Sequence, residues 1–147
     1  MMNIVIANDQ GAVELTKKII KHLEVAGHTV NYLGIDHEES IDYPDQAEKA
    51  CIEYKKGDYD FGIVCCGTGI GISIAANKVK GIRCALVQDI YSAQKAKQHN
   101  NANFIAFGGR IEYKEKPLDI LDAFIKTDFE GGRHQRRVTK IMDIESK

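Results

Sequence analysis

A cysteine followed directly by a glycine-rich turn is the part of the chain best suited to chemistry. Residues 61–66 form a short, nearly all-apolar run that is typical of a buried parallel strand and ends at Cys66. The turn Gly-Thr-Gly-Ile-Gly (67–71) comes next and leads into helix-compatible residues. Glycines let backbone N–H groups approach a ligand, and a helix N-terminus adds unpaired donors and partial positive charge. The sequence therefore predicts an anion-binding turn with a thiol at its edge.

The turn has neither the Gly-Lys-Ser/Thr ending of a P-loop nor the G-x-G-x-x-G spacing of dinucleotide-binding proteins. Its donors suit an oxyanion such as an enediolate, and a thiolate beside them can act as a base or nucleophile. The alternative is that Cys66 is simply a small buried residue at a strand end. Cys65 faces the opposite side of the strand and is predicted to be core.

Two further groups could contribute to a site. His99 is followed by Asn100 and Asn101 before the next strand, which offers a titratable acid with amide donors, or else a C-capping cluster. Arg133 and Arg137 lie at i and i+4 near the start of a predicted last helix, so their guanidinium groups share a face and suit a phosphate. A solvated basic helix start is the alternative, although cations at a helix N-terminus oppose the macrodipole.

The chain alternates strands and helices, which predicts a single α/β domain. The predicted fold is a three-layer, Rossmann-like arrangement of a five-stranded parallel sheet with helices on both faces. Ligands in such folds gather at the carboxyl ends of the strands, where Asp9, the 67–71 turn and Arg110 fall. The predicted strands are 3–7, 29–33, 61–66, 83–87 and 104–107, and the predicted helices are 13–26, 45–56, 71–80, 92–99, 116–126 and 132–146.

Composition narrows the class of protein. At 147 residues with 44% hydrophobic and 28% charged residues, the chain is expected to be one soluble domain, residues 1–147. A net charge of −1 gives no reason to expect nucleic acid or a membrane as partner. The four cysteines match neither a metal-ligand spacing nor a secreted disulfide framework, and no signal peptide or membrane span is evident. We therefore expect a cytoplasmic protein with reduced thiols and no metal or cofactor.

Three segments, CGTGIGISIAANK, DIYSAQKAKQHNNANFIAFGGR and FEGGRHQRRV, resemble the ribose-5-phosphate isomerase B and galactose-6-phosphate isomerase family. The resemblance covers almost the full length and is nearer to the ribose-5-phosphate isomerase B branch. It implies a metal-free aldose–ketose isomerase that acts on a sugar phosphate through a cis-enediolate. It also implies a homodimer or tetramer whose sites are shared between subunits, with the helix at about 132–146 at the dimer interface.

The resemblance assigns roles to individual residues. Cys66 would move the proton between C1 and C2, the 67–71 backbone would hold the oxyanion, and the partner's His99 would open the sugar ring. The phosphate would be held by Arg133 and Arg137, with Arg110 from the partner. The implied catalytic residues are Cys66, His99 and Thr68, and the implied substrate-binding residues are Asp9, Gln10, Tyr43, Gly67, Gly69, Ile70, Gly71, Asn100, Arg110, Arg133 and Arg137.

Gln10 departs from the family pattern, which usually has a histidine after the aspartate. Glutamine donates hydrogen bonds but cannot shuttle protons near neutral pH. Ribose 5-phosphate is the first expected substrate, and a hexose 6-phosphate or tetrose 4-phosphate is the alternative, with residues 33–40 and Gln10 shaping the sugar end of the pocket. A non-catalytic sugar-phosphate-binding subunit and a nucleotide-binding regulator are hypotheses from other classes.

Overall fold

The computed structural model describes residues 1–147 and contains one five-stranded sheet with all neighbouring strands parallel. The strand order is β2-β1-β3-β5-β4. The strands are β1 Asn3–Asn8, β2 Thr29–Tyr32, β3 Phe61–Cys66, β4 Cys84–Leu86 and β5 Phe104–Gly108. The helices are α1 Val13–Val25, α2 Tyr43–Tyr54, α3 Ile70–Ala76, α4 Ile90–Gln98, α5 Pro117–Lys126 and α6 Arg133–Glu145, with a short 3-10 turn at Gln10–Ala12. The predicted fold class is confirmed.

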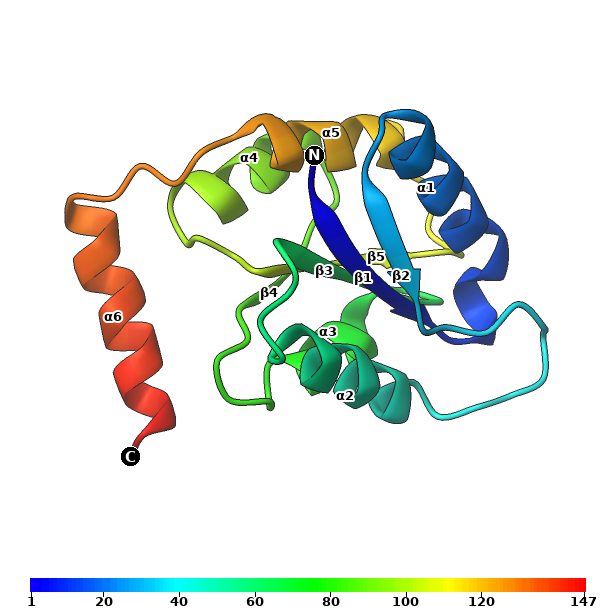
Figure 1. Ribbon diagram of the computed structural model, residues 1–147, viewed down its shortest axis with the longest axis horizontal. Helices are drawn as coiled ribbons and strands as arrows, with labels where there is room; N and C mark the ends of the chain where they lie inside the picture. Colours follow the sequence, from blue (N-terminus) through cyan, green and yellow to red (C-terminus); the bar gives the residue numbers. More distant parts are fainter.

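Helices cover both faces of the sheet, so the molecule has three layers (Figure 1). Helices α1, α4 and α5 bury their apolar residues in one core, and α2 and α3 bury theirs in another. Strand residues alternate between the two cores because successive side chains of a strand point to opposite faces. Cys65 lies in the first core and Cys66 in the second, as the alternation predicts.

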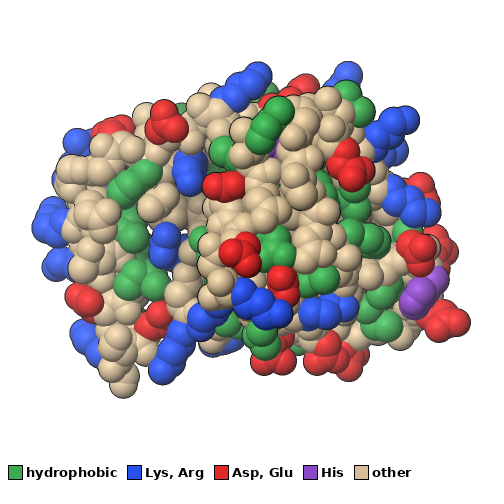
Figure 2. Space-filling model, in the orientation of Figure 1, with side chains coloured by type: hydrophobic (Ala, Val, Ile, Leu, Met, Phe, Trp, Pro, Cys, Tyr) green, Lys and Arg blue, Asp and Glu red, His purple; other side chains and the backbone are tan.

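Helix α6 stands apart from the layered body, on the opposite side of the molecule from the carboxyl ends of β1 and β2 (Figure 1). Only His134 and Val138 of this helix are buried, whereas Ile141 and Ile144 are exposed. A hollow of about 510 Å³ lies between α6 and the body, with Ile82 and Ile141 in its wall (Figure 2). The chain alone therefore leaves apolar surface of α6 uncovered.

The structure corrects one predicted element substantially. Helix α3 ends at Ala76, whereas the sequence predicted a helix over 71–80. Asn77 ends it because its side chain is committed elsewhere: Nδ2 donates to the Cys84 carbonyl at 2.9 Å, and Oδ1 accepts from the Cys84 N–H at 2.7 Å. This bond pair joins the end of α3 to the start of β4. None of the six helices has the length and hydropathy needed to span a membrane.

Candidate active site

Cys66 is the last residue of β3, and its thiol is held by the turn that follows. The backbone N–H of Gly69 donates a hydrogen bond to Sγ over 3.2 Å. Gly69 has φ of +80°, a conformation that glycine adopts without steric cost, and it immediately precedes α3. Cys66 itself is only 4% exposed. The thiol therefore lies beside the predicted turn, in a mostly covered position.

Of the other N–H groups in the turn, one donates to an acceptor within the chain and three do not. The Ile70 N–H donates to Oγ1 of Thr68 at 3.1 Å, so the exposed threonine caps the start of α3 while its own hydroxyl proton stays available. The N–H groups of Gly67, Thr68 and Gly71 have no acceptor within the chain. Three backbone donors thus remain for an anion next to the thiol.

Asp9 lies at the carboxyl end of β1, against the same turn. Its Oδ1 accepts from the Gly11 N–H at 2.8 Å, and the residue is 5% exposed. Gly11 approaches the turn so closely that a Cβ there would lie 2.6 Å from the Gly67 nitrogen. Burial raises the pKa of the Asp9 carboxyl, and the Gly11 N–H and the Arg110 charge oppose this shift. A partly desolvated carboxylate is therefore placed within a few ångströms of the predicted anion site.

Arg110 follows β5 and lies beside the turn of its own chain. Its backbone N–H donates to the Gly67 carbonyl at 2.9 Å, and its Nη1 lies 3.4 Å from where a Cβ on Gly67 would be. The implied sharing of the phosphate between Arg110 of one subunit and Arg133 and Arg137 of the other stays a prediction, and within one chain Arg110 lies beside the turn that follows Cys66. The reason is the sheet order: β3 and β5 are neighbours, so their carboxyl-end loops run side by side.

Gln10 and Tyr43 border the same region. Gln10 accepts a hydrogen bond from the Ile41 N–H through Oε1 at 3.0 Å, so it fastens the loop before α2. Gln10, Glu38 and Arg110 line a polar hollow of about 260 Å³. The Tyr43 ring packs on Gly71, where an added Cβ would lie 2.6 Å from Cε1. Glu38 brings part of the 33–40 segment to this hollow beside Gln10.

Two buried amides hold this edge of the sheet together and were not singled out in the sequence. Asn8 is fully buried, and its Nδ2 donates to the carbonyls of Asp9 (2.9 Å) and Ile35 (3.0 Å). Gln46 of α2 donates to the Asn8 carbonyl at 2.9 Å. An asparagine at the end of an otherwise apolar strand was the sequence feature that could have revealed this role of Asn8.

The residues described so far lie together at the carboxyl ends of the strands. We call Asp9, Gln10, Tyr43, Cys66, the 67–71 turn and Arg110 the sheet-end half of the site.

His99 and Asn100 lie near the amino ends of the strands, opposite the end at which Cys66 lies. His99 caps the carboxyl end of α4, and the chain then enters β5 at Phe104. Cys66 pairs with Gly108, the last residue of β5. The five residues of β5, a length of roughly 16 Å, therefore separate the end of the sheet at Cys66 from the end at His99. The structure does not bring His99 or Asn100 to Cys66 of the same chain.

The turn after α4 is rigidly built. Asn101 has φ of +45°, the left-handed conformation that the C-capping alternative predicts, and His99 is itself the C-cap residue of α4. The Arg83 guanidinium donates to the Asn101 carbonyl at 2.7 Å and to the Asn100 carbonyl at 3.3 Å. Arg83 is thus a positioning residue for this turn that the sequence did not reveal.

Arg133 is the first residue of α6, and Arg137 follows one turn later, as predicted. Both are exposed, and their spacing places them on one face of the helix. Because α6 stands away from the carboxyl ends of β1 and β2 (Figure 1), we expect these guanidinium groups not to reach the 67–71 turn of their own chain. We call His99, Asn100, Arg133 and Arg137 the helix half of the site.

Comparison with known proteins adds independent findings. A family model described as Ribose/Galactose Isomerase matches residues 4–141. Ribose-5-phosphate isomerase B of Escherichia coli K12 is 42% identical over 147 residues, covering 100% of this chain and 99% of the relative. The solved ribose-5-phosphate isomerase B of Clostridium thermocellum has a TM-score of 0.95 at 46% identity, covering 99% of this chain and 98% of that one. The Mycoplasma genitalium enzyme, solved with bound ribulose-5-phosphate, has a TM-score of 0.92 at 42% identity, covering 99% of this chain and 97% of that one.

Proposed function

The chain belongs to the ribose/galactose isomerase family, and from this premise we propose that it interconverts ribose 5-phosphate and ribulose 5-phosphate. The observation that carries the proposal is the Cys66 thiol beside a turn with three unpaired backbone donors. The relatives named for this reaction, including one solved with bound ribulose-5-phosphate, match the chain over nearly its full length. The protein is thus an aldose–ketose isomerase.

We assign the proton transfer to Cys66. As a thiolate, its Sγ takes the proton from C2 of the open-chain aldose, and the electron pair moves toward the carbonyl to give an enediolate. The same proton returns to C1, and a hydroxyl proton moves from O2 to O1, which leaves the ketose. The free N–H groups of Gly67, Thr68 and Gly71 meet the negative charge; one such donor contributes about 2.7–4 kcal/mol in comparable sites.

We also propose that a second copy of the chain completes each site. The helix half lies about a strand length from the sheet-end half in one chain, so only a partner's His99, Asn100, Arg133 and Arg137 could face Cys66. The exposed Ile141 and Ile144 of α6 and the apolar hollow beside them support contact with another copy through this helix. The partner's His99 then opens the sugar ring, and its two arginines hold the phosphate.

The remaining assignments follow from the sheet-end half. Asp9 and Arg110 are placed to bind sugar hydroxyls and the phosphate end, and Tyr43 covers the side of the pocket at Gly71. Gln10 uses its carbonyl oxygen on the Ile41 N–H, so only its amide donors remain for a substrate. We place the protein in the cytoplasm, where a reducing environment keeps the catalytic thiol free.

The proposal is tested by substituting each of the two adjacent cysteines. Cys66→Ala should lower kcat on ribose 5-phosphate by about 10²–10⁴-fold, because a positioned base contributes that much, while substrate binding persists. Cys65→Ala is the matched control, because Cys65 lies in the opposite core, and its kcat should stay within a few-fold of wild type. Unchanged turnover in Cys66→Ala would sink the mechanism.

A panel of sugar phosphates tests the substrate. Ribose 5-phosphate should give the highest kcat/KM, and a hexose 6-phosphate or tetrose 4-phosphate in first place would move the specificity to the alternative. Binding without turnover of any sugar phosphate by the wild type would instead identify a binding subunit. Protection against heat by AMP or NAD alone would point to a nucleotide-binding regulator.

A further inference from the structure

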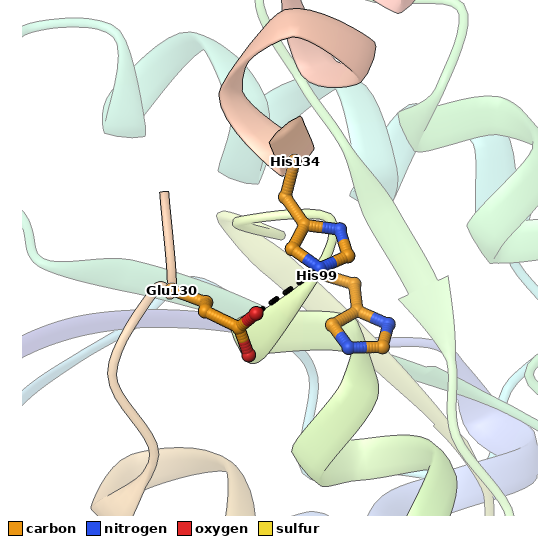
Figure 3. A group of neighbouring side chains, drawn as sticks. All are labelled: His99, Glu130 and His134. Atoms are coloured by element: carbon orange, nitrogen blue, oxygen red, sulfur yellow. Dashed lines mark ion pairs between the residues drawn. The ribbon is translucent and has the colours of Figure 1, made fainter. Parts of the chain in front are cut away.

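A second histidine lies directly against His99. The ring of His134 in α6 stacks on the His99 ring with centroids 4.0 Å apart and planes inclined by 8° (Figure 3). His134 is 4% exposed, one of only two buried residues of α6. Its Nε2 lies 3.4 Å from Oε1 of Glu130 and makes no hydrogen bond within the chain. A buried imidazole whose Nε2 has only an ion-pair contact with Glu130 and no hydrogen bond is costly to bury, which suggests that it serves the neighbouring ring.

The three side chains do not form a metal site as they lie. Their potential ligand atoms fall within 4.8 Å of one another. A metal ion bound by an imidazole lies near the plane of that ring, however, and the two ring planes are almost parallel and stacked. One ion cannot lie in both planes, so the arrangement fits a ring stack and not coordination.

We propose that His134 is a positioning residue for His99: its stacked ring fixes the orientation of the partner-facing imidazole and sets a second titratable group against its face. This inference depends on the proposed role of His99 in opening the sugar ring. The backbone at His99 is already fixed, because its N–H donates to the Lys95 carbonyl at 2.9 Å and Arg83 holds the following turn. The His99 side chain makes no hydrogen bond within the chain, so the stack on His134 is what holds the ring.

The charges around His99 also depend on this stack. Loss of hydration lowers the pKa of His99, and His134 and Lys95 of its own helix lower it further. Arg133 of α6 acts in the same direction, and Glu130 in the preceding loop opposes them. The imidazole consequently stays neutral to a lower pH than free histidine does. A neutral imidazole can accept one proton and return it to another oxygen, which is the transfer that ring opening requires.

His134→Phe tests the charge while keeping a ring in the stack. The His99 titration, followed by NMR of its ring protons in the intact protein, should shift to higher pH by about 0.5–1 unit. The acid limb of kcat/KM for ribose 5-phosphate should shift in the same direction, with kcat near pH 8 largely retained. Because His22 on α1 pairs with Asp122 on α5, outside the stack, its ring-proton signals serve as an internal control that the substitution should leave unchanged.

Two further variants keep the test decisive. Glu130→Gln changes a half-exposed side chain and should shift the His99 titration to lower pH, the opposite direction, because a neighbouring carboxylate is removed. His134→Ala removes the stack and should lower kcat about 10-fold at all pH values with KM retained. Unmoved His99 titration in both His134→Phe and Glu130→Gln overturns the inference. If the wild type shows no isomerase activity, the proposed function fails, yet the titrations still report whether the stack acts on His99.

Discussion

The two halves of the site are built in opposite ways. The sheet-end half is assembled by one chain from loops that follow neighbouring strands, and its parts are bonded to one another: Gly69 to Cys66, Gly11 to Asp9, and Arg110 to Gly67. The helix half sits on α6 and on the end of α4, and its Asn100, Arg133 and Arg137 side chains are exposed. One half is preorganised within the chain, and the other presents its groups outward.

The contrast indicates which task each half has. An oxyanion must meet donors that are already in place, because reorganisation during the reaction would consume the stabilisation. A phosphate far from the reacting carbons needs only guanidinium groups at the correct spacing, and two arginines one helical turn apart supply them. The chemical step therefore depends on the folded chain, and substrate capture depends on how two chains meet.

Mixing two inactive variants tests whether the halves come from different chains. Cys66→Ala and the double variant Arg133→Ala/Arg137→Ala should each be nearly inactive at substrate concentrations below KM. Co-refolded in equal amounts, they should regain about a quarter of wild-type activity, since half of the randomly assorted dimers are mixed and each has one intact site of two. Activity of the whole mixture is the first measurement, and the mixed dimer, isolated with two different tags, should show about half of wild-type activity because every one of its molecules has one intact site of two.

The matched control combines two variants of the same half. Cys66→Ala with Asp9→Asn should regain nothing, because every site in the mixed dimer still carries one of the two changes. No recovery in the first pair would show that each chain holds a complete site, and recovery in this control pair would show that Asp9 and Cys66 of one site come from different chains.

Glycine substitutions separate the turn's chemistry from its backbone strain. Gly69→Ala and Gly57→Ala both place a side chain at positive φ, which costs about 1–2 kcal/mol of unfolding free energy. At Gly69 the new Cβ would also lie 2.8 Å from Leu86 Cδ1 and 2.9 Å from the Phe107 carbonyl carbon, whereas nothing lies within 4 Å at Gly57. We expect Gly69→Ala to lose about 2–4 kcal/mol in urea unfolding and most of its kcat. Gly57→Ala should keep its kcat, and equal losses in the two variants would contradict the strained-turn description.

Much of this architecture was predictable from the sequence because it depends on local pattern. Apolar runs and their spacing predicted the parallel sheet, the opposite facing of Cys65 and Cys66, and the start of the last helix near Arg133. The length of α3 was not predictable, because Asn77 ends it through bonds to Cys84, seven residues away. The placement of Arg110 depends on strand order, which residue types do not encode.

Side-chain pairings between distant segments were also out of reach of the sequence. The stack of His134 on His99 joins two helices separated by more than thirty residues. The Arg83 bonds to the Asn101 carbonyl and the Gln10 bond to Ile41 likewise depend on how loops approach in the folded chain. Residue type limits what each group can do, and tertiary packing decides which partner it meets.

Two capping aspartates that follow strands β1 and β4 should respond to pH in opposite directions. The Asp9 side chain accepts from Gly11 and is buried, so its pKa is raised, chiefly by loss of hydration. The Asp89 side chain accepts from the Ser92 N–H at the start of α4, and that bond lowers its pKa. A raised carboxyl pKa contributes stability that is present at low pH and lost as pH rises through the folded value, whereas a lowered one contributes stability that is lost as pH falls.

Asp9→Asn and Asp89→Asn therefore form a matched pair, since asparagine caps a helix about as well as aspartate. At pH 7, Asp9→Asn should be at least as stable as wild type, with the difference between the two vanishing as pH falls toward 4. Asp89→Asn should be less stable than wild type at pH 7 and approach it at low pH. Thermal unfolding of both variants from pH 2 to pH 7 measures the two slopes, since the contribution of Asp89 is lost only below the ordinary aspartate pKa of 3.8. Because the buried Asp9 beside the 67–71 turn costs stability near neutral pH while the Asp89 cap of α4 supplies it, slopes of the same sign would contradict the idea that burial dominates at Asp9 and hydrogen bonding at Asp89.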